Sequence, residues 1–212
     1  MKSKSTTIFS IIFVLVLGVY EIAHGAIVAN DLADPYPGGK MIEANVIDGA
    51  AFFFQAQINI SALFLEGENG SKDKLNFGNC ITNIDAAIGN LKLAQERMLA
   101  AAATAKTTIA DENKIAILKG FDYDKLTSEK RLVKEIMQQV KLYLAQGNIP
   151  GFYQAFANGL DDMINHLQMM RDKLAANNQP TIDDFWYLLN RSYYIGLFGN
   201  YGTVVGQTAL KY

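Results

Sequence analysis

The sequence predicts an all-α fold: an antiparallel bundle of four long helices plus one shorter helix, with an extended N-terminal arm. Apolar residues recur in steps of three and four along most of the chain after residue 40. No segment alternates apolar and polar residues for long enough to require a sheet. Only four prolines occur in 212 residues, and Pro35 and Pro37 precede the helical pattern. A helical bundle satisfies all three observations.

The start of the chain has the pattern of an export signal. Lys2 and Lys4 precede the apolar run "IFSIIFVLVLGVY", which is too short to span a bilayer as a helix. Ala23 and Gly25 occupy the two positions that a signal peptidase reads, so we expect cleavage before Ala26. The sequence therefore divides into a signal peptide at 1–25, an extended arm at 26–40 and a helical bundle domain at 41–212.

Charge and cysteine content limit the partners and the location. Loss of Lys2, Lys4 and Glu21 with the signal leaves 17 basic and 20 acidic residues, a net charge of about -3. That balance excludes nucleic acid as an expected partner. Cys80 is the only cysteine, so an exported chain of this size has no internal disulfide. We expect an exported bacterial protein that is periplasmic or secreted, without a stable transmembrane anchor after signal cleavage.

The first predicted helix runs from Met41 to the polar stretch "EGENGSKD". It is also apolar away from its main stripe, at Phe52, Phe54 and Phe64, so we expect it to lie centrally. Its stripe consists of Ile42, Val46, Gly49, Phe53, Ala56, Ile60 and Leu63.

A second long helix is predicted after residue 79, with a stripe rich in alanine, the best helix former. Its stripe consists of Cys80, Ile84, Ala87, Leu91, Ala94, Met98, Ala101, Ala105 and Thr108. A short helical turn over "KIAILK" should end at Gly120. The one shorter helix of the bundle then follows Thr127 or Ser128. We expect its inward side chains to be Leu132, Ile136, Val140 and Tyr143.

Two more long helices complete the chain. Asn148 is expected to cap the first of them, with Pro150 in its first turn. Its stripe consists of Phe152, Phe156, Leu160, Met163, Leu167, Met170 and Leu174. Thr181 begins the last helix, where Asp183 and Asp184 place negative charge at the positive end of the helix dipole.

Small residues occupy one face of the last helix, at Gly199, Gly202 and Gly206. Each glycine inside a helix costs roughly 1 kcal/mol relative to alanine, so we expect close packing of a neighbouring helix as compensation. Two alternatives remain: a break of the helix near "GNYG", and a membrane span over the uncharged residues 192–210.

Aromatic residues gather in the last two helices. If these helices are antiparallel, the start of one lies near the end of the other. The sequence then predicts an apolar ligand pocket between them. Its expected residues are Phe152, Phe156, Tyr194, Phe198 and Tyr201. The alternative is that these rings simply fill the core.

Catalytic and metal-binding patterns are scarce. His166 is the only histidine after the signal, and we expect it to pair with Asp162 one turn earlier on a helix surface. The alternative is catalysis with His166 as the base and Cys80 as the nucleophile, but Cys80 lies on an apolar stripe. After the expected signal, no Glu-x-x-His pair, Cys-x-x-Cys-His motif, calcium loop or phosphate loop occurs. We therefore expect neither a cofactor nor a metal.

The sequence favours a non-enzymatic exported protein that acts as a binding or interaction module. Its partner would be an unidentified protein or a small apolar ligand. One alternative is a structural subunit of a surface or secretion assembly, which would form homo-oligomers or larger complexes through the apolar first helix. Another is a protein that perturbs membranes with that helix.

Overall fold

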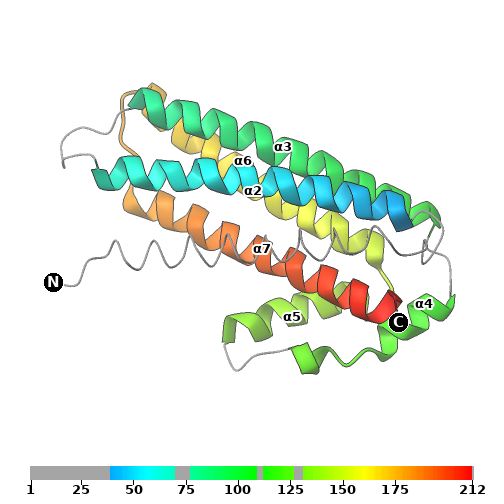
Figure 1. The fold of residues 1–212 in the computed structure, drawn as a ribbon. Coiled ribbons are helices and arrows are strands. Elements are labelled where there is room, and N and C mark those ends of the chain that lie inside the picture. Colours follow the sequence, from blue (N-terminus) through cyan, green and yellow to red (C-terminus); the bar gives the residue numbers. More distant parts are fainter. Residues whose placement is uncertain (1–38, 70–76, 109–111, 127–130, 212) are drawn as a thin grey trace.

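The described residues form six α-helices and one 3₁₀ turn and contain no strand (Figure 1). The computed structural model describes residues 39–69, 77–108, 112–126 and 131–211. The predicted signal and residues 26–38 of the predicted arm lie outside them. The elements are α2 (Gly39–Asn69), α3 (Phe77–Thr108), α4 (Glu112–Gly120), η1 (Tyr123–Leu126), α5 (Arg131–Leu144), α6 (Ile149–Ala175) and α7 (Ile182–Lys211). The prediction of an all-helical fold is confirmed, and α2 begins two residues before Met41.

The four long helices α2, α3, α6 and α7 lie lengthwise beside one another, and α5 lies outside this group beside the C-terminal half of α7 (Figure 1). The closest neighbours are α2 with α3 and α3 with α6. The apolar stripes explain this packing, because every described residue of the α3 and α6 stripes is buried. Burial of each large apolar side chain contributes roughly 1.5–3 kcal/mol.

Contacts between helices fix their relative register. Asn59 of α2 accepts a hydrogen bond from Asn90 of α3, and Asp48 faces Arg97 at 3.8 Å. Residues later in α2 therefore contact residues earlier in α3. The same holds between α3 and α6: Gln95 donates to the carbonyl of Ala157 at 3.2 Å, and Arg171 pairs with Asp85 at 2.6 Å.

Caps and turns delimit the last two helices. The side chain of Asn148 accepts a hydrogen bond from the backbone N–H of Gly151, which confirms the predicted cap. Gly147, in the turn before it, has φ +69°, a conformation that favours glycine. Between α6 and α7, Asn177 takes the left-handed conformation at φ 60°.

Two details of the expected core are wrong. Leu132 was expected to face inward but is 37% exposed; α5 buries Val133, Ile136, Met137, Val140 and Leu144 instead. Ile136 and Val140 are buried as expected, so the inward face is rotated only slightly, and both Leu132 and Val133 fit a 3.6-residue period beside them. The first helix is not central either. Phe52 and Phe54 are only half-buried, because α2 packs mainly on α3 and makes few contacts with α7.

The last helix is continuous from Ile182 to Lys211, so it does not break near "GNYG". In the described part of the chain, one helix is long and apolar enough to cross a membrane by length and composition. That helix is α2, over Met41–Leu63, and not α7.

Candidate functional site

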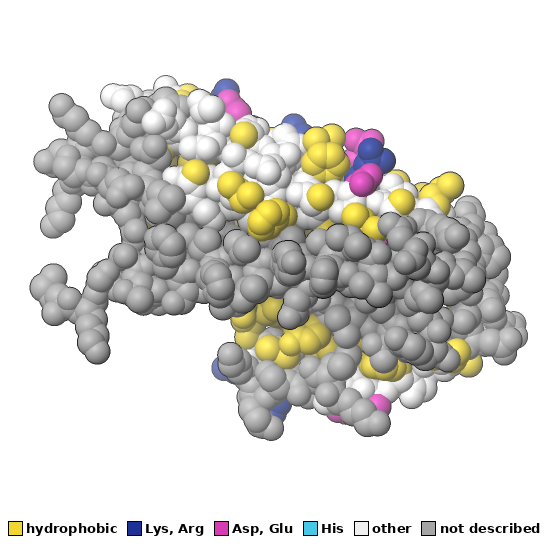
Figure 2. Space-filling view, viewed as in Figure 1, with side chains coloured by type: hydrophobic (Ala, Val, Ile, Leu, Met, Phe, Trp, Pro, Cys, Tyr) yellow, Lys and Arg dark blue, Asp and Glu magenta, His cyan; other side chains and the backbone are white. Residues whose placement is uncertain are grey.

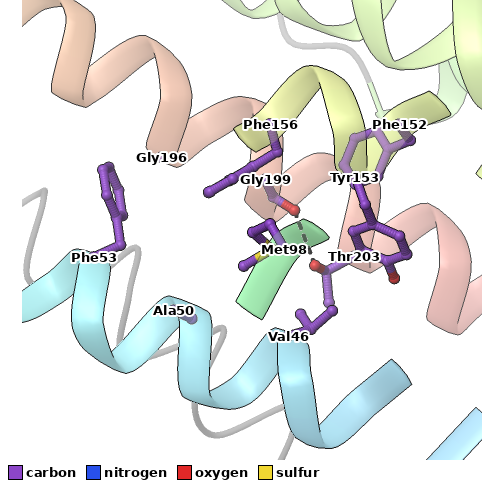
Figure 3. A pocket seen from close by; sticks show the side chains of 10 residues that line it. All are labelled: Val46, Ala50, Phe53, Met98, Phe152, Tyr153, Phe156, Gly196, Gly199 and Thr203. Atoms are coloured by element: carbon purple, nitrogen blue, oxygen red, sulfur yellow. Dashed lines mark hydrogen bonds between the residues drawn. The ribbon is translucent and has the colours of Figure 1, made fainter. Parts of the chain in front are cut away.

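An apolar crevice lies where α2, α3, α6 and α7 approach one another (Figure 3). Val46, Ala50 and Phe53 come from α2, and Met98 comes from α3. The remaining lining residues belong to α6 and α7: Phe152, Tyr153, Phe156, Gly196, Gly199 and Thr203. The Thr203 hydroxyl donates to the carbonyl of Gly199 at 2.9 Å, so its polar group is satisfied within α7.

Two glycines of α7 receive phenylalanine rings of α6. A Cβ atom on Gly199 would overlap the ring of Phe156, and one on Gly202 would overlap the ring of Phe152. Both glycines are buried. The rings thus fill the space that larger side chains on α7 would occupy. Gly206 lies in α7, but its surroundings are outside the described residues.

The five predicted pocket residues are divided between the crevice and its surroundings. Phe152 and Phe156 line the crevice, whereas the other three do not. Phe198 packs against Phe152, with ring centroids 4.8 Å apart. Tyr194 lies under the guanidinium of Arg191 at 5.8 Å. Tyr201 is half-buried, and burial raises the pKa of both Tyr194 and Tyr201.

The crevice is small. The space that the centre of a water molecule can reach inside it is about 20 Å³, which is room for about one water. A lipid or drug-sized ligand would require Phe152 or Phe156 to move. Sequence reasoning missed the contribution of Val46, Ala50, Phe53 and Met98, although the first three follow helical spacing on the first helix.

His166 is paired differently from the prediction. Nε2 of His166 lies 2.9 Å from the backbone carbonyl oxygen of Asp184, and the imidazole stacks on Tyr187 at 4.3 Å. Asp162 instead forms an ion pair with Arg191. The expected Asp162–His166 pair is therefore wrong, because α7 offers closer partners to both side chains.

Asp184 ties α6 to the start of α7. Its carboxylate accepts hydrogen bonds from Lys173 Nζ at 2.9 Å and from the backbone N–H of Thr181 at 2.7 Å. The Thr181 side chain accepts from the Asp184 N–H at 3.3 Å, which gives a reciprocal cap. Burial raises the pKa of Asp184, but the hydrogen bonds from Lys173 and Thr181 outweigh burial, and the pKa lies below its usual range.

The register of α3 and α6 separates the two candidate catalytic residues. Because Asp85 pairs with Arg171, Cys80 lies level with residues near 175. That position is about nine residues, or roughly 14 Å, beyond His166 along the helix axis. Cys80 is also buried in the core. Among the described residues, no group of three His, Cys, Asp or Glu side chains could hold a metal ion.

A buried amide connects α2 and α7 beside the crevice. Gln57 is 5% exposed, and its Nε2 donates to the Ser192 hydroxyl at 2.9 Å. Its Oε1 atom has no hydrogen-bond partner. An unpaired buried acceptor costs about 1–3 kcal/mol, so this contact favours a defined position of α2 more than it favours stability.

The outward surface of α2 carries a second apolar series. We call Ala44, Ile47, Ala51, Phe54, Ile58 and Ser61 the outer stripe of α2; each residue is exposed or half-buried, and Ile58 is 43% exposed. Only a third of the apolar window of α2 is buried. Figure 2 shows hydrophobic side chains with few charges among them on the described surface over α2 and α3. The sequence signal was the apolar character outside the inner stripe.

Comparison with protein-family models, curated proteins and solved structures finds no match to this chain.

Proposed function

We propose that this chain is an exported, non-enzymatic interaction protein, an antiparallel helical bundle that binds another protein through the outer stripe of α2. The observation that supports it most directly is the exposure of this stripe on a 31-residue helix whose inner face is buried. An exposed apolar series of this length is typical of an interaction surface.

The antiparallel arrangement is inferred from the paired contacts. Phe152 of α6 meets Gly202 of α7, Phe156 meets Gly199, and Gly159 meets Ile195. Together with the registers of α2 with α3 and of α3 with α6, these pairs indicate that each neighbouring helix runs opposite to the last.

The electrostatics of α2 fit a protein partner. The apolar window Met41–Leu63 contains two charged residues, Glu43 and Asp48, and Asp48 already faces Arg97. The outer stripe itself carries no charge, so docking of an apolar helix would bury no unpaired ion.

A second candidate function is binding of a small apolar ligand in the crevice. The ring of Phe156, which lies over Gly199 in the lining of the crevice, supports it because rotation of this ring would enlarge the space. A thermal shift on addition of a medium-chain alcohol, abolished by Val46→Phe, is the expected result for this function.

Site-specific photo-crosslinking tests the interaction proposal. A benzoylphenylalanine at position 58 is compared with the same probe at Gln138, an exposed residue of α5, in the bacterium that produces the protein. We expect a protein adduct from position 58 only. Adducts with lipid alone would favour the membrane-perturbing alternative, and equal labelling at both positions would refute the proposal. The intact mass of the recovered protein should correspond to a chain that begins at Ala26.

A further inference from the structure

The geometry points to a second copy of this chain as the partner on the outer stripe of α2, with the two α2 helices antiparallel about a two-fold axis. This inference rests on the proposed function, since it names the partner for the same surface. It is derived from the spacing of the stripe, the sizes of its side chains and the positions of the nearby acids.

The outer stripe has the 3–4 spacing of a two-helix seam. Steps of three, four, three, four and three residues connect Ala44 to Ser61, which are the a and d positions of a heptad pattern. The inner stripe of the same helix occupies the opposite side and is already covered by the bundle. The outer stripe is therefore a second seam without a partner helix among the described residues.

Side-chain sizes along this seam are complementary to themselves in the antiparallel direction. A two-fold axis level with residues 52 and 53 places Ala51 beside Phe54 of the partner subunit, so a small residue meets a large one. The next layer outward sets Ile47 beside Ile58 of the partner subunit. The outermost layer sets Ala44 beside Ser61 of the partner subunit. Each inner layer thus has a similar total volume, as even interhelical spacing requires.

A parallel pair would pack less evenly. It would place Phe54 against Phe54 of the partner subunit and, one turn away, Ala51 against Ala51 of the partner subunit. The helices would have to stand apart at one layer and leave a void at the next, and such voids are destabilising.

Charge also favours the antiparallel pair. With the axis between residues 52 and 53, Asp48 lies about 14 Å along the axis from Asp48 of the partner subunit, and Glu43 lies about 28 Å from its copy. Both separations exceed the Debye length of about 8 Å at physiological salt. A parallel pair would bring the like charges level with each other.

The size of the surface sets the expected affinity. The 23-residue apolar window of α2 is roughly 34 Å long at 1.5 Å per residue and about 10 Å wide. Each subunit would therefore bury about 350 Å² of its surface in the dimer interface. A total near 700 Å² is below that of standard stable interfaces, which bury about 1,200–2,000 Å². We therefore expect a weak, reversible dimer.

Sedimentation equilibrium of the chain from Ala26 at 5–300 μM tests this inference. The wild-type protein should show a concentration-dependent shift from monomer to dimer. Ile58→Glu should weaken association at least tenfold, whereas Leu142→Glu, at a 63% exposed residue of α5, should not change it. Circular dichroism checks that each variant is folded. A wild-type protein that stays monomeric throughout, or equal effects of both variants, would overturn the inference.

The register has its own test. Ala51→Phe alone should abolish the dimer, because two pairs of Phe rings then meet. The exchange Ala51→Phe with Phe54→Ala should restore it, because each layer again contains one Phe and one Ala. Mixing Ala51→Cys with Phe54→Cys should give a disulfide heterodimer under mild oxidation, while Gln138→Cys should not, and Cys80 is buried. Preferential Ala51→Cys homodimers would refute the antiparallel register.

Failure of this inference can be told apart from failure of the proposed function. A monomer that still gives a protein adduct at position 58, with a different protein, retains the interaction function and removes the second copy as the partner.

Discussion

The packing of Phe152 on Gly202 predicts a net loss of stability for Gly202→Ala. Two effects oppose each other. Alanine is better than glycine inside a helix by roughly 1 kcal/mol, which would stabilise α7. The new Cβ, however, would overlap the Phe152 ring. This ring is 3% exposed and lies against Phe198 and Tyr153, with centroids 4.8 and 5.4 Å away, so it has little freedom to move.

Overpacking of a core costs about 1–3 kcal/mol or more, and the severe overlap places this substitution at the upper end. We therefore expect a net destabilisation of about 1–2 kcal/mol, which corresponds to a fall in Tm of roughly 2–8 °C for a chain of this size. Urea denaturation of the chain from Ala26, followed by circular dichroism, measures it.

Gly89→Ala is the matched control. Gly89 lies inside α3, is exposed and has nothing within 4 Å of an added Cβ. This variant should therefore be stabilised by up to about 1 kcal/mol. Adding Phe152→Leu to Gly202→Ala should recover part of the loss, because the shorter side chain leaves room for the methyl group. The reasoning is refuted if Gly202→Ala proves as stable as Gly89→Ala, or if the double variant shows no coupling between the two positions.

Two further predictions concern polar contacts. Because the pKa of Asp184 is lower in the folded protein than its ordinary value of 3.8, the carboxylate stabilises the fold above that value. This contribution is lost as pH falls through the folded pKa. Asp184→Asn should therefore reduce the free energy of unfolding at pH 7 and flatten its fall below about pH 4. Urea titrations at each pH would show this, and an unchanged slope contradicts it. Ser192→Ala should cost about 1–3 kcal/mol because it leaves the buried Gln57 amide without its hydrogen bond. Gln57→Met should be nearly neutral, because it also removes the unpaired Oε1 and the Ser192 hydroxyl can bond a carbonyl one turn earlier in α7. Equal effects of these two variants in thermal denaturation would show that the amide contact does not matter.

Periodicity predicted most of the fold, because the inner stripes of α3 and α6 are regular and continuous. It was ambiguous for α5, where Leu132 and Val133 both fit a helical face and only tertiary contacts select Val133. It also misjudged α2, since a helix that is apolar all round can be central or can expose a second surface. Local periodicity does not show which helices pack against a given face, and that packing decides between these outcomes.

The candidate site was only partly accessible from the sequence. Phe152 and Phe156 could be assigned to the crevice because the α6 stripe sets their direction. The α2 side of the crevice depends on the distance between α2 and α7, which no local pattern encodes. The pairing of Asp162 with Arg191 rather than His166 likewise depends on the register of α6 against α7.

The corner formed by Lys173, Thr181 and Asp184 has a consequence for the order of folding. Lys173 and Asp184 are eleven residues apart, so their contact closes a short segment and loses little chain entropy. Contacts between α3 and α6 join residues 62 and 86 positions apart and require a much larger closure. Asn59 of α2 and Asn90 of α3 are 31 positions apart, an intermediate separation. The α6–α7 hairpin should therefore form early, followed by the pairing of α2 with α3, and the contacts between α3 and α6 should join these two pairs last.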